Sequence, residues 1–229
     1  MIGAHAPDER LVLSGPPVPA DDFGYVGWSA GIWRKTLSLF RPTSDDRYGL
    51  RDAMPNYRRY RVSGGCYFFT VNLLERENTL LVDRIGLLRE SVRVCKRKRP
   101  FHIDAWVVLP EHMHCIWTLP EGDDDFANRW KMIKTHFSKE VPVNERRSKT
   151  RLLRGERGIW QRRYWEHLIR DDRDYKNHMD YLHFNPVKHG WVKNVTEWPY
   201  SSFHRYLKRG VYSVDWAGGE LNDLKTGER

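Results

Sequence analysis

The segment from Leu109 to Leu119 constrains the fold more than any other part of the chain, because it combines strand-forming residues with two histidines. Side chains alternate between the two faces of a β-strand, so His112 and His114 lie on one face while Met113 and Cys115 point to the other. Two imidazoles at that spacing are close enough to share a divalent metal ion. Paired histidines also occur as hydrogen-bonded core residues, so the spacing alone leaves both interpretations open.

Apolar periodicity on either side of the histidine segment predicts further strands and helices. Strands are expected at residues 66–73, 103–109 and 160–170, where β-branched and aromatic residues gather. Apolar residues recur at helical spacing over residues 81–95 and 126–137, which predicts two amphipathic helices. The histidine segment is therefore one strand in a chain that mixes strands and helices along its length.

A further helix is predicted to begin at the acidic pair 171–172 and to end before Pro186, because proline biases the residue before it out of helical geometry. At about 100° per residue, an apolar stripe holds Tyr175, Met179 and Leu182. A separate stripe about a quarter turn away holds Asp174, His178, Tyr181 and Asn185. Tyr181 thus has polar neighbours. His178 either orients the phenol or a metal ion or is a surface histidine, and the surface histidine is expected because it is the commoner outcome on a helix.

The charge of the chain favours an anionic partner. The formal net charge is +9, and ten tryptophans and eleven tyrosines offer faces on which bases can stack. Residues 1–53 hold six basic and seven acidic residues, so all of the surplus belongs to the later part. Residues 144–158 are rich in arginine and are expected to form a mobile loop. This loop either follows a phosphate backbone or is a solvated insertion.

Targeting and cysteine content narrow the class of protein further. No apolar run approaches the length of a membrane span, and Asp8 and Glu9 interrupt anything resembling a secretory leader, which favours a cytoplasmic protein. The three cysteines are widely spaced, so neither a disulfide framework nor a thiolate zinc site is supported. Residues 1–53 lack a clear period and are interpreted as a poorly ordered extension.

A histidine pair, a tyrosine on a polar helical stripe and surplus basic residues fit a site that cleaves phosphodiesters. A phenol with a pKa near 10 needs a nearby cation to become a nucleophile at neutral pH, and a metal ion supplies one. The phenolate of Tyr181 then attacks phosphorus, forms a 5′-phosphotyrosine link and releases a 3′-hydroxyl. A later 3′-hydroxyl can rejoin the strand without ATP. This agrees with the absence of a phosphate-binding loop and predicts no nucleotide cofactor.

Residues 54 to about 217 resemble the REP-associated tyrosine transposases, bacterial relatives of the single-tyrosine HUH transposases of the IS200 type. The resemblance rests on residues 57–60 (YRRY), 68–73 (FFTVNL), 105–114 (AWVVLPEHMH) and 181–190 (YLHFNPVKHG). The family implies an α+β, ferredoxin-like antiparallel sheet with helices on one face. It also implies one HUH nuclease domain over 54–217, between the extension and a C-terminal tail at 218–229.

By this resemblance, Tyr181 is the nucleophile and His112 and His114 bind the metal ion. Asn185 occupies the place of a third polar ligand, and oxygen ligands favour Mg²⁺ or Mn²⁺. The expected substrate is single-stranded DNA that contains a REP-type hairpin, and the branch is expected to act as a monomer. The residues expected to contact DNA are Tyr57, Arg58, Arg59, Arg61, Arg93, Lys96 and Arg97.

Two alternatives keep the same residues but change the function. The first is a domesticated relative that binds hairpin DNA without cleaving it, and the second is a relaxase-like HUH endonuclease with another substrate. A zinc-dependent nucleobase deaminase is excluded, because the chain lacks both the H-x-E and the P-C-x-x-C motifs of that class.

Overall fold

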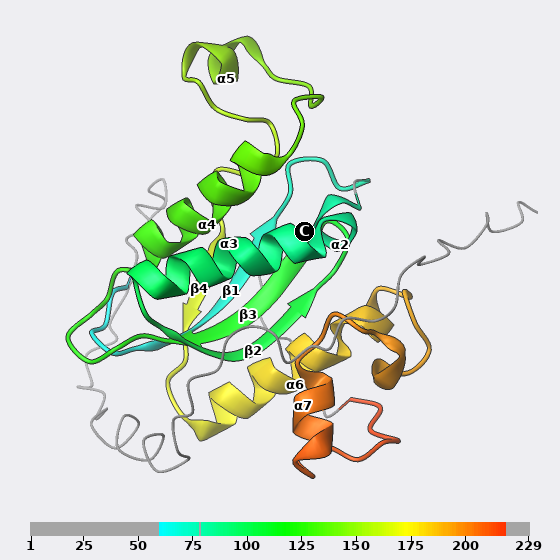
Figure 1. Cartoon of the computed structure of the whole chain (residues 1–229). Coiled ribbons are helices and arrows are strands. Elements are labelled where there is room, and N and C mark those ends of the chain that lie inside the picture. The colour runs from blue at the N-terminus through cyan, green and yellow to red at the C-terminus, as the bar shows by residue number, and fades with distance from the viewer. Residues whose placement is uncertain (1–59, 78, 219–229) are drawn as a thin grey trace, which may run out of the picture.

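The structure of the chain, a computed structural model, describes residues 60–77 and 79–218 (Figure 1). The predicted extension at 1–53, the predicted DNA contacts at residues 57–59 and the tail beyond residue 218 lie outside these ranges. Within the described ranges, no helix has both the length and the apolar character needed to cross a membrane.

Four antiparallel strands form one sheet in the order β2-β3-β1-β4. The strands are β1 (Cys66–Asn72), β2 (His102–Val108), β3 (His112–Thr118) and β4 (Trp165–Leu168). Helix α3 (Ile85–Lys98) connects β1 to β2, and helix α4 (Phe126–Glu140) connects β3 to β4. The predicted α+β fold with an antiparallel sheet is confirmed, and β3 with its two histidines is an inner strand.

Helices cover both faces of the sheet (Figure 1). The connecting helices α3 and α4 share an apolar core with alternate sheet residues such as Phe69 and Trp117. Helix α6 (Asp172–Lys188) packs on the other face, in a second apolar cluster that includes Phe68 and Ile116. The prediction of helices on one face therefore holds for the two connecting helices and is wrong for α6.

The remaining elements are short. Helix α2 precedes α3, α5 lies between α4 and β4, and the 3₁₀ helix η1 and helix α7 follow α6. Their bounds are α2 (Leu80–Asp83), α5 (Lys149–Leu153), η1 (Val195–Glu197) and α7 (Phe203–Lys208). The helix predicted at 81–95 is thus two helices that meet at Arg84, whose backbone leaves helical geometry.

Helix α6 passes through Pro186 and ends at Lys188, so the prediction that proline would end it is wrong. The helix ends instead at the hydrogen bonds that cap its last turn. Gly190 has a φ of 72°, its N–H bonds the Val187 carbonyl, and the N–H of Trp191 bonds the Pro186 carbonyl at 3.0 Å. This pattern is a Schellman motif, which accepts glycine in the left-handed region and satisfies the last carbonyls of the helix.

Arg129 joins the start of α4 to the connection between α3 and β2. Its side chain is 1% exposed, and its guanidinium donates to both carboxylate oxygens of Asp123, at 3.0 and 2.6 Å. Further bonds reach the carbonyls of Arg99, Pro100 and Asp125. The Arg129 hydrogen bond holds the pKa of Asp123 below its ordinary value.

We expect Arg129→Met to lower the free energy of unfolding by about 2–3 kcal/mol, because it removes a buried guanidinium that pairs with the partly exposed Asp123 and orphans three carbonyls. Urea denaturation followed by circular dichroism measures the change. The matched control is Lys131→Met, an exposed position on the same helix, which should shift stability by less than about 0.5 kcal/mol. Equal effects of the two substitutions would contradict the role given to Arg129.

Candidate active site

Strand β3 presents His112 and His114 on the face that α6 covers, as strand alternation predicted. Both side chains are buried, and their ring centroids lie 4.9 Å apart at an interplanar angle of 81°. A second partner holds each ring: His112 Nδ1 lies 2.8 Å from Glu111 Oε1, and His114 Nδ1 lies 2.9 Å from Thr70 Oγ1. Each Nδ1 is thus engaged by an orienting partner, which is common in metal-binding histidines.

Glu111 is the partner that orients His112. Burial disfavours its carboxylate, but the hydrogen bond and charge interaction with His112, together with smaller contributions from its backbone and from His189, outweigh burial, and the pKa of Glu111 falls below its ordinary value. A carboxylate on Nδ1 fixes the tautomer of an imidazole and raises the basicity of Nε2. This arrangement is typical of metal-binding histidines and of buried structural histidines alike.

Helix α6 brings Tyr181 to the histidine pair. Its ring lies 5.5 Å from the His114 ring, and the ring of Phe68 contacts both, at 5.4 Å from His114 and 6.1 Å from Tyr181. Asn185, one turn further along the same stripe, is fully buried. Residues more than 60 positions apart in the sequence therefore meet on one face of the sheet.

Lys188 is part of the site, and the sequence analysis missed it. Its Nζ donates a hydrogen bond of 2.8 Å to Tyr181 Oη and lies 4.6 Å from the centre of the tyrosine ring. Lys188 follows Tyr181 by seven residues, which is two helical turns and places both on one side of α6. That spacing was the available signal, and the prediction that Pro186 ends the helix concealed it.

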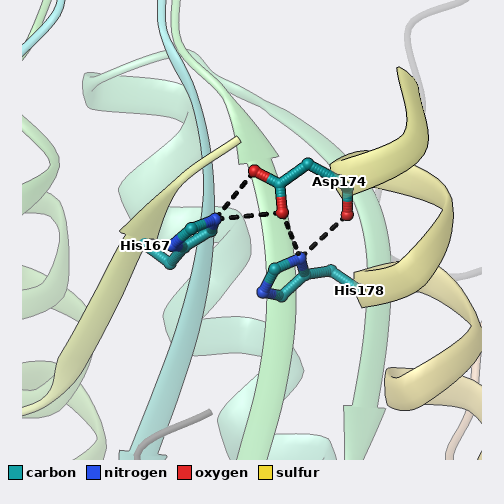
Figure 2. A group of neighbouring side chains, drawn as sticks. All are labelled: His167, Asp174 and His178. Carbon is teal, nitrogen blue, oxygen red and sulfur yellow. Dashed lines mark hydrogen bonds and ion pairs between the residues drawn. The ribbon is translucent and has the colours of Figure 1, made fainter. Parts of the chain in front are cut away.

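A second polar cluster joins β4 to the first turns of α6 (Figure 2). His167 Nε2 lies 2.8 Å from Asp174 Oδ2, and His178 Nδ1 lies 3.0 Å from Asp174 Oδ1. His178 Nδ1 is also 2.8 Å from the Asp174 carbonyl, which can only accept, so Nδ1 carries the proton. His178 is 2% exposed, so its prediction as a surface histidine is wrong: β4 and His167 cover it.

The charge of Asp174 is well stabilised. Burial disfavours its carboxylate, but hydrogen bonds from His167, from His178 and from the Arg170 backbone N–H outweigh burial, and the pKa of Asp174 falls far below its ordinary value. His167, Asp174 and His178 each offer one ligand atom within 4.8 Å of the others, a spacing that suits a divalent ion. The same atoms already form a continuous hydrogen-bonded chain, which ties the edge strand to α6.

The predicted DNA contacts that the structure describes lie away from Tyr181. Arg93 and Arg97 are on α3, on the opposite face of the sheet, and both pair with Glu90. Lys96 lies 5.9 Å from the centre of the Phe101 ring. Arg61 forms an ion pair with Asp124 at 3.6 Å. Their role in binding stays a prediction.

Comparisons with known proteins identify relatives of this chain. The chain is 53% identical over 176 residues to the REP-associated tyrosine transposase of Escherichia coli K12. The aligned residues cover 77% of this chain and 98% of the relative. A solved structure of a REP-associated tyrosine transposase bound to a REP hairpin is 52% identical, with a TM-score of 0.66. That match covers 77% of this chain and 98% of the solved one. No family model matches the chain.

Proposed function

Because the chain belongs to the REP-associated tyrosine transposases, we propose that it cleaves and rejoins single-stranded DNA beside a REP-type hairpin, with Tyr181 as the nucleophile. The observation that carries this proposal is the place of the Tyr181 side chain. Its ring lies beside His114 on β3, and its hydroxyl accepts a hydrogen bond from the Lys188 ammonium group. A phenol held between a cation and a pair of imidazoles is arranged for attack on a phosphodiester.

The proposed reaction balances in two steps. Tyr181 Oη forms a bond to phosphorus and loses its proton, while the bond from phosphorus to the 3′-oxygen breaks and that oxygen takes up a proton. The 5′-phosphate of the downstream strand is then joined to the tyrosine. In the second step a free 3′-hydroxyl attacks the same phosphorus, and Tyr181 leaves as a phenolate. Lys188 balances the negative charge on Oη in both directions.

The donor set of the histidine pair fits a divalent ion, which we propose to be Mg²⁺ or Mn²⁺. His112 and His114 are buried side by side and oriented by Glu111 and Thr70, and the Asn185 amide offers an oxygen. A bound ion would polarise a phosphate oxygen and offset its charge. Tyr181 and both histidines come from one chain, which supports action as a monomer.

The test is a denaturing gel of the protein with hairpin DNA that carries single-stranded flanks and a label at its 3′ end. The 3′ fragment stays on the tyrosine in the proposed reaction, so a labelled protein band is expected with Mg²⁺ or Mn²⁺ and should vanish with chelator. A hairpin that shifts on a native gel but forms no adduct would overturn cleavage and favour the hairpin-binding relative.

Lys188→Met should slow adduct formation by about 10²-fold, because it removes the cation that faces the developing charge on Tyr181. Lys176→Met is the matched control: Lys176 lies on the same helix and carries the same charge, but its Nζ pairs with Asp180. Single-turnover rates at saturating DNA separate this effect from binding. Partial recovery in Lys188→Arg is expected, and equal rates for the two methionine variants would contradict the role of Lys188.

A further inference from the structure

Residues 142–163 form a basic arm that contains α5 and stands out beyond the end of α4 (Figure 1). The sequence predicted a mobile loop here, but the structure fixes the base of the arm. Arg157 bonds the backbone carbonyls of Ser138, Val141 and Pro142 and pairs with Glu145. The Arg157 hydrogen bond lowers the pKa of Glu145 to about 2, so this pair stays charged at neutral pH.

The arm has little room to shift at its base. A side chain at position 158 would bring its Cβ within 2.5 Å of the Arg146 carbonyl oxygen, so only glycine fits there. The two limbs of the arm therefore approach each other closely where they leave the domain. Such packing sets the direction in which the arm stands.

The outgoing limb joins the end of the sheet where His112 begins β3. Trp160 pairs with Leu73, the N–H of Gln161 bonds the Asn72 carbonyl at 3.1 Å, and the N–H of Leu73 bonds the Glu111 carbonyl at 2.8 Å. Leu73 thus lies between the arm and the residue that orients His112. The base of the arm therefore meets the sheet at the end where β3 begins.

An open cleft of about 440 Å³ lies between the arm and the end of β1. Its lining is mixed: Leu74 supplies an apolar wall, and the hydroxyl and guanidinium groups come from Ser148, Thr150, Arg151, Arg162 and Arg163. The guanidinium of Arg151 is fixed by the carbonyls of Arg157 and Trp160, at 2.9 and 3.4 Å. The cleft thus has a rigid floor and a cationic rim.

The arm has a net charge of +6, which is two-thirds of the net charge of the chain. Residues 142–163 hold eight basic and only two acidic residues, against a net charge of +9 for the whole protein. Both acidic residues are already paired, Glu145 with Arg157 and Glu156 with Arg162. Arg163, at the rim of the cleft, is exposed. A surface of this kind attracts phosphates.

We propose that this cleft holds a nucleotide of the unpaired DNA next to the hairpin, with its phosphate at Arg163 and its base or sugar against Leu74. This inference rests on the proposed function, and it names a substrate contact that the histidine and tyrosine residues do not make. A pocket of this size with one apolar wall and a cationic rim suits a single unpaired nucleotide, because its base or sugar packs against the apolar wall while the rim neutralises its phosphate.

The experiment measures binding of fluorescent hairpin DNA by anisotropy at several salt concentrations, in chelator so that no DNA is cleaved. One hairpin carries unpaired flanks of about ten nucleotides on both sides, and the other is trimmed to the stem and loop. The variants are Arg163→Glu and, as a matched control, Arg209→Glu at the exposed end of α7. We expect Arg163→Glu to weaken binding of the flanked hairpin about tenfold and to reduce its salt slope by about 0.7 or more.

On the trimmed hairpin, Arg163→Glu should weaken binding by no more than the control Arg209→Glu does. Equal losses on both hairpins would overturn the proposal, since they would indicate a general effect of charge. No loss on the flanked hairpin would overturn it as well. Adduct formation by the wild-type protein with Mg²⁺ tests the proposed function separately. If the adduct forms but Arg163→Glu has no effect that depends on the flanks, only the cleft proposal is refuted. If Arg163→Glu has that effect but no adduct forms, only cleavage is refuted.

Discussion

Tyr181→Phe should abolish formation of the covalent adduct, with a fall in cleavage rate of at least about 10⁴-fold, because it removes the only atom of the side chain that can bond phosphorus. Phenylalanine keeps the ring that contacts Phe68 and His114. The variant should therefore fold normally and bind hairpin DNA within about threefold of the wild-type affinity.

The matched control for this substitution is Tyr175→Phe. Tyr175 lies on the same helix but in the apolar stripe, and it packs within the second apolar cluster. The Tyr175→Phe variant should cleave DNA within about tenfold of the wild-type rate, since the Tyr175 hydroxyl does not reach the histidine pair. Cleavage by Tyr181→Phe at a rate comparable with that of the control would remove Tyr181 as the nucleophile. Loss of both activities together with thermal stability would indicate a folding defect instead.

His114→Ala should reduce cleavage by about 10²–10⁴-fold and weaken Mn²⁺ binding at least about tenfold. His114 is fully buried between Thr70 and the Tyr181 ring, so its imidazole is fixed before any ion binds. Electron paramagnetic resonance of Mn²⁺ reports binding without reference to activity. His136→Ala is the control, because His136 lies on α4, on the opposite face of the sheet, and contacts Ser91.

The same titration separates the two candidate metal sites. If Mn²⁺ binds His114→Ala with wild-type affinity and stoichiometry, the ion does not occupy the histidine pair on β3. Loss of binding in Asp174→Asn would then point to the cluster of His167, Asp174 and His178. Retained binding in Asp174→Asn together with loss in His114→Ala is the result that we expect.

Two periodicities were enough to predict which residues share the candidate site. Alternation along β3 placed His112 with His114, and helical spacing placed Tyr181 with Asn185. Both depend only on neighbours along the chain, which is why they could be read from the sequence. That the two sets meet is a property of the α6 packing, and it came from the family resemblance.

What the sequence missed depends on contacts between distant segments. His178 is buried because β4 covers it, and no pattern within α6 indicates that cover. The basic face of α3 was recognised from its spacing, but periodicity does not say which face of the sheet a helix covers. Arg93 was therefore predicted to contact DNA without a place relative to Tyr181, and α3 lies on the face of the sheet opposite α6 (Figure 1).

The sheet separates the residues that hold the fold together from those that would do chemistry. The stacked rings of Trp117 and Trp130, 4.2 Å apart, lie in the core between the sheet and helices α3 and α4. Tyr181 and Lys188 meet on the opposite face of the sheet, which α6 covers. A lineage that lost cleavage through one substitution at Tyr181 or Lys188 would inherit an intact scaffold. A cleaving enzyme and a hairpin-binding protein without nuclease activity would thus differ by one substitution and share one fold.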